Sequence, residues 1–457
     1  MSSTENRKDF TEGGLLKKMF LFAIPMILST FLQLLFNAAD IAIVGQDAEN
    51  GTTYQAAVGA TSSMIHLIVN LFMGISVGAN VAMATAFGAK DEDRQRRIVH
   101  TSIALSSVGG VAIMILGASI AKPVMTLMQT PENVLPYAVL YMQIFFLGAP
   151  ANIVYNFGAS LFRAVGETKK PLFYLFVAGV INVMINVITV VFLDMHVIGV
   201  ALGTVISQYV SAVWVVRDLM KEKGATKLVL KSVRFYKREL LKILFLGVPT
   251  GITNCLFSVS NVLIQSTINS YGDIVMSGST IAVNVDGFLD AFSSSFSGAT
   301  LTVIGQNIGA KKPERIRKAI GSGALLLTVS YLIADCVLLL LGEYIYLLFN
   351  SSPLVVEKAL ERMRITSLTY LLVVPMSIYG AALRSMGYSI IPMIINLICT
   401  CLFRVLWISF AYPLAPSYAM VLYSYPITWM LSGASHVVLY YILERKFLKK
   451  QSGTGAE

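Results

Sequence analysis

The sequence predicts an all-α integral membrane protein of about twelve transmembrane helices, arranged as two parallel six-helix repeats. Three observations predict this fold. The chain of 457 residues is 56% hydrophobic and only 13% charged, apolar segments recur along its whole length, and the second half repeats motifs of the first half. Soluble globular proteins carry about 25% charged residues, so the composition excludes that class.

Apolar windows of about 20 residues, the length that a helix needs to cross a bilayer, occur throughout the chain. They lie at 19–44, 56–86, 98–121, 135–160, 172–193, 197–219, 239–269, 277–307, 319–342, 359–384, 390–412 and 419–443. With the polar segments around them, they predict an N-terminal tail (1–14), an N-lobe (15–217), a charged linker (218–238), a C-lobe (239–445) and a C-terminal tail (446–457).

The basic residues predict how the chain is oriented in the membrane. Of the 35 Lys and Arg residues, all but five fall in the tails and in the connections on one side of the predicted spans. The other side holds Lys122, Lys358, Arg362 and Arg364, and Arg404 alone is counted within a span. Cytoplasmic connections carry the excess of Lys and Arg, so we expect a multi-pass protein of the cytoplasmic membrane with both termini in the cytoplasm. The net charge of +10 then reflects contact with lipid headgroups and not with nucleic acid.

The second half of the chain repeats the first. Gly88–Arg97 matches Gly309–Lys318 at an offset of 221, and Pro25 in the first span matches Pro249 at an offset of 224. At the offset of 221, Arg163, Gly166 and Pro171 fall on Arg384, Gly387 and Pro392. Each half has six predicted spans, an even number, so both halves enter and leave the membrane on the same side and the repeats are parallel. Two such lobes favour an alternating-access transporter over a channel.

Polar residues in the N-terminal half gather on single helix faces. In the first span they follow one another at steps of four, four and three: Ser29, Gln33, Asn37 and Asp40. In the fifth span Asn182 and Asn186 are four residues apart, again on one face. A carboxylate among such groups can take up and release a proton near neutral pH, as a proton-coupled carrier requires. The alternative is that Asp40 only hydrogen-bonds asparagines and holds the helices together.

Acidic residues in the C-terminal half have no counterpart in the first half. Asp286 and Asp290 are four residues apart in the eighth span, and Asp335 lies in the ninth. Intramembrane ionisable groups are costly and usually face a cavity or a partner. The pair could attract a cationic substrate, bind a cation or form an ion pair with Arg404, for which Asp335 is a competing partner. Together with Asp40 these acids make four carboxylates against one intramembrane arginine. Such an excess of negative charge would favour cations in a shared cavity.

Motifs of nucleotide hydrolysis, metal binding and covalent catalysis are absent from the sequence. It contains no Gly-rich phosphate loop ending in Lys-Ser or Lys-Thr, no His-Glu-x-x-His, no Gly-x-Ser-x-Gly and no Cys-x-x-Cys. We therefore expect no enzyme activity, no cofactor and no metal site, and transport driven by an ion gradient.

The order of these features resembles the multidrug and toxic compound extrusion (MATE) family over residues 15–445. The residues that carry the resemblance are Pro25 followed by Asn37–Gly45, Gly88-Ala-Lys with its repeat in Gly305–Lys311, and the Arg163–Gly166 turn before Pro171. The resemblance implies a V-shaped pair of six-helix lobes. It also implies export of drug-like, often cationic compounds in exchange for H+ or Na+.

The resemblance also implies roles for single residues. Asp40 corresponds to a cation-coupling carboxylate with Asn182 close by, and Asp286 lies in the region of an acidic residue of the eighth helix. Two departures concern the coupling ion: Asn186 stands where members often carry Asp, and Thr250–Ile268 lacks the Glu that sodium-coupled members tend to have. These departures favour H+ over Na+.

We assign two sets of residues to the functional site. We expect cation coupling by Asp40, Asn182, Asn186 and Asp286, and substrate binding by Gln33, Asn37 and Asp290. We expect a monomer that binds a small molecule and a coupling cation. The alternative is a flippase for lipid-linked precursors from the same wider superfamily, which one intramembrane Arg against four Asp makes less favourable.

Overall fold

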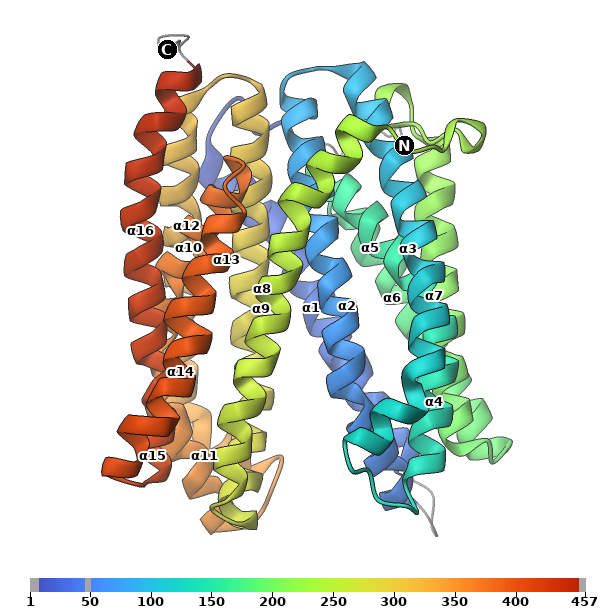
Figure 1. The fold of residues 1–457 in the computed structure, drawn as a ribbon, viewed down its shortest axis with the longest axis vertical. Helices are drawn as coiled ribbons and strands as arrows, with labels where there is room; N and C mark the ends of the chain where they lie inside the picture. Colours follow the sequence, from blue (N-terminus) through green and yellow to red (C-terminus); the bar gives the residue numbers. More distant parts are fainter. Residues whose placement is uncertain (1–7, 46–50, 452–457) are drawn as a thin grey trace. The chain divides into compact units, whose positions relative to one another are not determined.

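A computed structural model describes residues 8–45 and 51–451 of the chain. Parts of both predicted tails, 1–7 and 452–457, therefore lie outside the described residues. The described chain is helical along nearly all of its length (Figure 1). By its internal packing it divides into two compact units: unit 1 contains the described residues up to Asp9 and Leu28–Gly251, and unit 2 contains Phe10–Ile27 and the described residues from Ile252 onward.

The helices of the first half are α1 (Leu15–Val44), α2 (Gly51–Gly88), α3 (Glu92–Leu127), α4 (Leu135–Leu147), α5 (Ala149–Ala164), α6 (Lys169–Asn186) with the π-helix η1 (Val187–Phe192), and α7 (His196–Lys221). Those of the second half are α8 (Lys237–Asn269), α9 (Asp273–Gly309), α10 (Pro313–Leu347), α11 (Pro353–Ile365), α12 (Val373–Ser385), α13 (Ile390–Asn396), α14 (Phe403–Leu406), α15 (Tyr418–Leu422) and α16 (Ser424–Gln451). Short 3-10 and π segments join several of them: η2 (Gly224–Thr226), η3 (Leu230–Ser232), η4 (Ser367–Leu372), η5 (Leu397–Leu402), η6 (Trp407–Ala411) and η7 (Tyr412–Leu414).

The described helices confirm the predicted membrane fold. Nine helical segments are long and apolar enough to cross a bilayer, and α4 with α5, bent by 47° at their junction, forms a tenth. The helices α9 and α16 are more polar, but with 37 and 28 residues they exceed the length that a span needs. Counted with them, the described part of the chain has the predicted number of about twelve spans.

Two helix prolines mark where the units exchange segments. Pro25 lies inside α1 and Pro249 inside α8, and a proline within a helix removes a backbone hydrogen bond and permits a bend. The chain passes from one unit to the other two residues after each proline, following Ile27 and Gly251. The start of α1 thus belongs to unit 2 and the start of α8 to unit 1. The boundaries of the two compact units differ from those of the predicted lobes. The lobe boundaries stay a prediction.

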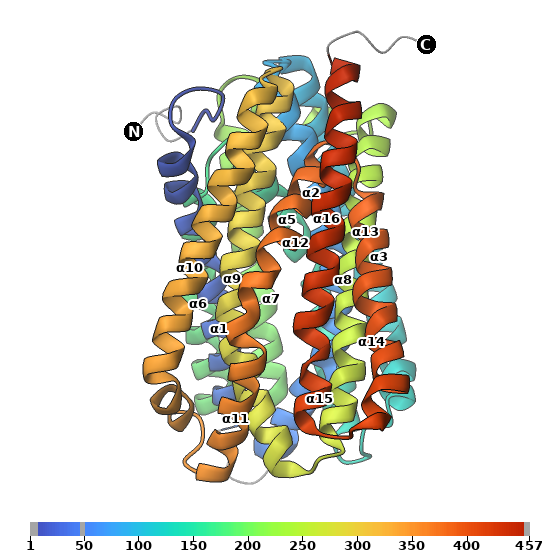
Figure 2. The same cartoon turned by 90° about the vertical axis from the view of Figure 1, so that its left-hand side faces the viewer.

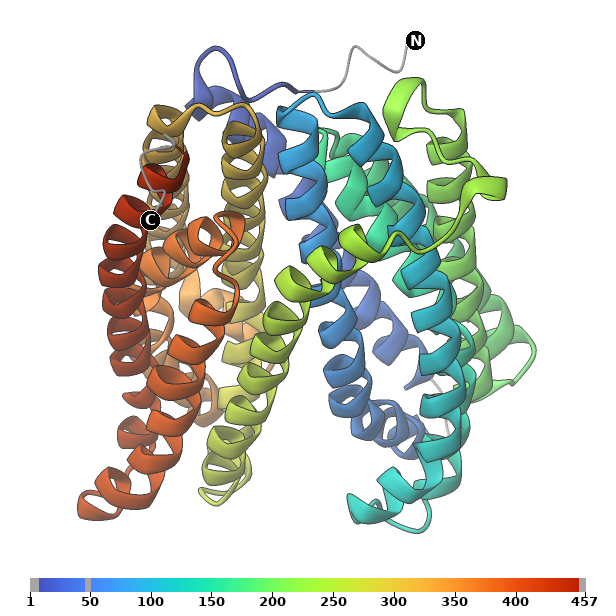
Figure 3. The same ribbon diagram turned by 45° about the horizontal axis from the view of Figure 1, so that its top comes forward.

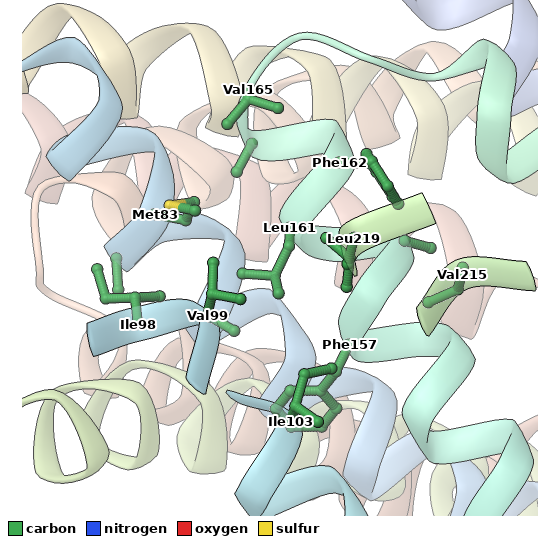
Figure 4. Packing of buried hydrophobic residues seen from close by; sticks show 14 of the residues in the cluster. Met83, Ile98, Val99, Ile103, Phe157, Leu161, Phe162, Val165, Val215 and Leu219 are labelled. Carbon is green, nitrogen blue, oxygen red and sulfur yellow. The ribbon is translucent and has the colours of Figure 1, made fainter. Parts of the chain in front are cut away.

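Small and aliphatic side chains form the core of unit 1. Figure 4 shows Met83, Ile98, Val99, Leu161 and Leu219 pointing toward one another from α2, α3, α5 and α7. These helices pack in pairs, α3 with α5 and α5 with α7. In a spanning helix, the face that does not join the core meets lipid and not water. Because lipid tails are as apolar as the core, close packing holds the bundle together and exclusion of water does not.

The segment that joins α7 to α8 packs on unit 1. It contains the two 3-10 turns η2 and η3, drawn in yellow-green in Figure 3. The Val229 N–H donates to His100 Nε2 at 3.2 Å, and the Tyr236 N–H donates to Thr101 Oγ1 at 3.2 Å. Both acceptors lie on α3, so most of the segment predicted as a linker is fixed to one helix of unit 1.

In unit 2, α12 is the central helix. It packs against α9, α10 and α16, and α13 packs against α16 (Figure 2). A π-helix, η5, follows α13 directly, as η1 follows α6 in unit 1. Such local widening of a helix occurs often at functional sites.

Glycines bring α2 and the start of α8 into backbone contact within unit 1. A Cβ added at Gly74 would lie 2.2 Å from Gly251 Cα, and one added at Gly78 would lie 2.2 Å from Ile243 O. Gly247 faces Ile75 in the same way. Helices in membranes use such small residues because close backbone approach supplies van der Waals contact.

We predict that Gly74→Ala separates α2 from α8 and lowers the free energy of unfolding by about 1–3 kcal/mol, the usual cost of overpacking. The matched control is Gly59→Ala on the same helix, where an added Cβ has nothing within 4 Å. Thermal unfolding in detergent would measure both variants. An equal midpoint for the two variants would contradict the prediction.

Candidate functional site

A carboxylate surrounded by amide and hydroxyl groups lies inside unit 1. Asp40 is near the end of α1, and Asn186 Nδ2 of α6 donates to its Oδ1 at 2.6 Å. Thr204 Oγ1 of α7 lies 3.5 Å from its Oδ2. When the Asn182 amide is oriented so that its oxygen accepts from the Thr204 N–H at 3.2 Å, its nitrogen donates to Asp40 Oδ1 at 2.8 Å. This orientation satisfies both ends of the amide.

The helical repeat and one glycine position these groups. Asn182 and Asn186, four residues apart, share a face of α6 and are 5% and 0% exposed. Gly203 of α7 leaves room for the second of them, because a Cβ there would lie 2.0 Å from Asn186 Oδ1. The sequence predicted both asparagines, but it did not indicate Thr204 or Gly203, since small residues of these types are common in transmembrane helices.

The charge of Asp40 has no cationic partner in the described part of unit 1. Its contacts are hydrogen bonds from Asn182, Asn186 and Thr204, all of them neutral. Asn186 Oδ1 is buried without a hydrogen-bond partner among the described residues, so it is a further oxygen beside the carboxylate. A proton or a small cation that prefers oxygen ligands could neutralise this group. The described residues contain no group of three His, Cys, Asp or Glu side chains that could hold a transition metal.

The other polar residues of α1 are placed differently. Gln33 and Asn37 are exposed and do not belong to the cluster around Asp40. An exposed amide on a span is available for contact with a solute, so their predicted role in substrate binding stays a prediction.

In unit 2 a buried arginine pairs with Asp286 of α9. Asp286 Oδ1 accepts a hydrogen bond from Ser367 at 2.7 Å, and its Oδ2 lies 3.6 Å from Arg362 Nε. Arg362 is 3% exposed and also donates to Ser279 Oγ at 3.0 Å. The charge distribution assigned Arg362 to the side of the membrane opposite the termini. In the structure it is a buried residue of α11, in a segment long and apolar enough to span.

The predicted ion pairs of Arg404 are wrong for the described residues. Arg404 is 1% exposed, and its Nη1 donates to Asn261 Oδ1 at 2.8 Å and to Ser260 Oγ at 3.3 Å. Its guanidinium carbon lies 4.4 Å from the centre of the Tyr425 ring, and that of Arg362 lies 5.2 Å from the same centre. Cation–π contact and neutral acceptors therefore take the place of a carboxylate.

Asp290 and Asp335, the other two acids that the sequence placed in spans of this half, both lie near Tyr331. Asp290 is exposed, although it shares a helix face with Asp286, and Tyr370 Oη lies 3.4 Å from its Oδ1. Asp335 is 8% exposed, and its Oδ1 has no hydrogen-bond partner in the described chain. Asp290 lies close enough to Asp286 for the two charges to interact, and of these acids Asp286 is the one paired with an arginine in the described chain.

Comparison with known proteins identifies the family of the chain by a family profile. The MatE family profile matches residues 25–188 and again residues 249–412, so its two matches begin at Pro25 and Pro249. The "Probable multidrug resistance protein YoeA" of Bacillus subtilis is 27% identical over 391 residues, which cover 83% of each chain.

Solved structures match almost the whole chain at low sequence identity. A MOP superfamily transporter from Pyrococcus furiosus, described as having a binding pocket of reversed polarity, has a TM-score of 0.90 and 19% identity, covering 98% of this chain and 99% of its own. A multidrug resistance MATE family transporter in an outward-facing conformation has a TM-score of 0.87 and 19% identity, covering 99% of each chain. These similarities confirm the predicted fold class and the expected duplication.

We predict that Arg362→Gln lowers the free energy of unfolding by about 3–5 kcal/mol, because it leaves the buried carboxylate of Asp286 without its cation. The double variant Arg362→Gln/Asp286→Asn should recover more than half of the loss, since neither charge then remains. Thermal unfolding in detergent would measure this. The control is Arg364→Gln, an exposed arginine on the same helix, which should change little. A double variant that is as unstable as the sum of the single ones would contradict the pairing.

Proposed function

Because the chain belongs to the MatE family of multidrug efflux transporters, we propose that it is a secondary active exporter that exchanges H+ for small, cationic or amphiphilic compounds by alternating access. The observation that carries the proposal is the Asp40 carboxylate, held by neutral donors alone. A proton that it takes up cancels the charge of this half-buried carboxylate. Uptake of a proton therefore changes the electrostatic free energy of unit 1 at the two carboxylate oxygens of Asp40.

Two features favour Asp40 over Asp286 as the coupling residue. Arg362 already balances the charge of Asp286 at 3.6 Å, so binding of a proton there would leave the arginine unpaired. Asp40 has no such partner in the described residues, and binding of a proton there removes an uncompensated charge. We therefore assign coupling to Asp40, Asn182 and Asn186, and give Asp286 a role in fixing unit 2.

The choice between H+ and Na+ depends on the number of oxygen ligands. A proton needs only the carboxylate and one acceptor, whereas a sodium ion needs several oxygens at once. The oxygens near Asp40 come from Asn182, Asn186 and Thr204. Asn186 directs its amide nitrogen at the carboxylate, and Asn182 does so in the amide orientation that satisfies both of its ends. This arrangement supports H+ as the coupling ion and Na+ as the second candidate.

The exposed polar groups of the spanning helices support a cationic or amphiphilic substrate. Gln33, Asn37 and Asp290 are exposed residues of spanning helices, and Asp290 adds a negative charge that attracts cations. The name of the Bacillus subtilis relative, a multidrug resistance protein, agrees with an amphiphilic substrate.

One observation keeps a second function open. Unit 2 buries two arginines, Arg362 and Arg404, where the sequence indicated one in the spans. A flippase for lipid-linked precursors would use such cations for the phosphate groups of its cargo. The carboxylate of Asp40 and the exposed Asp290 favour the exporter.

We predict that Asp40→Asn abolishes gradient-driven efflux of a fluorescent lipophilic cation while the protein still inserts and folds. The asparagine keeps the size of the side chain and one oxygen that can accept from Asn186, but it cannot bind a proton. Efflux from cells that express equal amounts of each variant would measure this. Asp93→Asn, an exposed acid at the start of α3, is the matched control and should export normally. Unchanged export by the Asp40 variant would refute the proposed coupling.

We predict that collapse of the proton gradient stops efflux and that collapse of the sodium gradient does not. Proteoliposomes loaded with the fluorescent cation allow each gradient to be set alone. Transport driven only by sodium would overturn the assignment of the ion, but it would leave the role of Asp40 intact. Transport of a lipid-linked pyrophosphate instead of the cation would favour the flippase.

A further inference from the structure

A group of basic residues lies at one end of α6 and α7, away from Asp40. Lys169 and Lys170 begin α6, and Arg217 and Lys221 lie in the last turns of α7. This is the end of the two helices that the distribution of Lys and Arg predicts to be cytoplasmic. In this position the side chains are at the depth of lipid headgroups.

The acids at this end are occupied by other partners. Lys170 Nζ lies 2.6 Å from Glu222 Oε1 and 4.0 Å from Asp218 Oδ2. The Tyr174 hydroxyl donates to Asp218 Oδ2 at 2.5 Å. In the part of the chain that the structure describes, these pairs leave Lys169, Arg217 and Lys221 without a carboxylate within 4.0 Å. Three cations are therefore available to a further anion.

A pocket of 360 Å³ opens among these residues. Its walls include Lys169, Arg217 and Asp218, together with the aromatic rings of Phe173 and Trp214. The two rings are stacked, with their centres 5.4 Å apart. A tryptophan at this depth is typical of the boundary between headgroups and acyl chains.

Apolar grooves continue from both sides of the pocket. One, of 640 Å³, runs along α7 between α3 and α5, from Tyr209 to Arg217 and Lys221. The thirteen residues from Tyr209 to Lys221 span about 18 Å of helix, which is comparable to an acyl chain. The other groove, of 350 Å³, lies between α1 and α6 and ends at Lys169. Arg217 lines both the pocket and the first groove, and Lys169 lines both the pocket and the second groove.

We propose that this surface of unit 1 binds an anionic phospholipid, with its phosphate between Lys169 and Arg217 and its acyl chains in the two grooves. Charge complementarity selects the anionic headgroup, since basic pockets between transmembrane helices on the cytoplasmic side recognise such lipids. The apolar grooves distinguish a lipid from a free phosphate. A lipid held there contacts α6 and α7, the helices that carry Asn186 and Thr204, and braces them at their cytoplasmic ends.

Titration of the detergent-solubilised protein with phosphatidylglycerol, read by native mass spectrometry, tests the proposal. The variant Lys169→Gln/Arg217→Gln should bind the lipid about 30-fold more weakly, the effect of two basic groups near a membrane surface. The variant Lys227→Gln/Lys231→Gln removes the same charge from exposed positions outside the grooves and should bind as the unaltered protein does. Val213→Trp, which fills the larger groove and keeps every charge, should also weaken binding.

Three results would overturn the proposal. The first is equal affinity for phosphatidylglycerol in the two charge variants, which would indicate unspecific attraction. The second is equal binding of phosphatidylcholine, which would show that the anionic headgroup is not recognised. The third is binding of glycerol phosphate as tightly as the lipid, which would show a phosphate site without a role for the grooves.

Discussion

The hydrogen bond from Asn186 to Asp40 is the interaction on which the functional argument depends. A carboxylate at bilayer depth costs free energy unless protein groups replace the water that it lost. The amide groups of α6 provide this replacement, but they carry no net charge. Asp40 therefore has no cationic partner among the described residues, and α6 and α7 contact the carboxylate oxygens to which we assign the coupling.

The two halves of the molecule share a duplicated fold but differ in how their intramembrane charges are paired. In unit 2 the acid of α9 faces Arg362 and Ser367, and Arg404 faces Asn261 and the ring of Tyr425. Charges that are balanced inside the protein stabilise an arrangement, whereas a charge that is not balanced can respond to an ion. The asymmetry follows from side chains, because both halves of the chain have a succession of long helices and a proline inside the first of them.

Packing without water explains other features of the fold. Lipid tails are as apolar as leucine, so helices associate through close contact and through polar groups that find partners. Gly74 and Gly251 allow such contact between α2 and α8. The same physics applies at the surface of unit 1, where grooves beside Arg217 and Lys169 expose apolar walls that only lipid or protein can cover.

The sequence by itself determined the membrane fold, the number of spans, the duplication and the helix faces that carry Asp40, Asn182 and Asn186. Apolar length and the 3.6-residue period are local properties, so they can be read along one chain. Only the tertiary structure decided that Arg362 pairs with Asp286, that Arg404 lacks a carboxylate partner in the described residues, and that Thr204 lies beside Asp40. These contacts depend on the rotation and depth of one helix against another, which no single helix specifies.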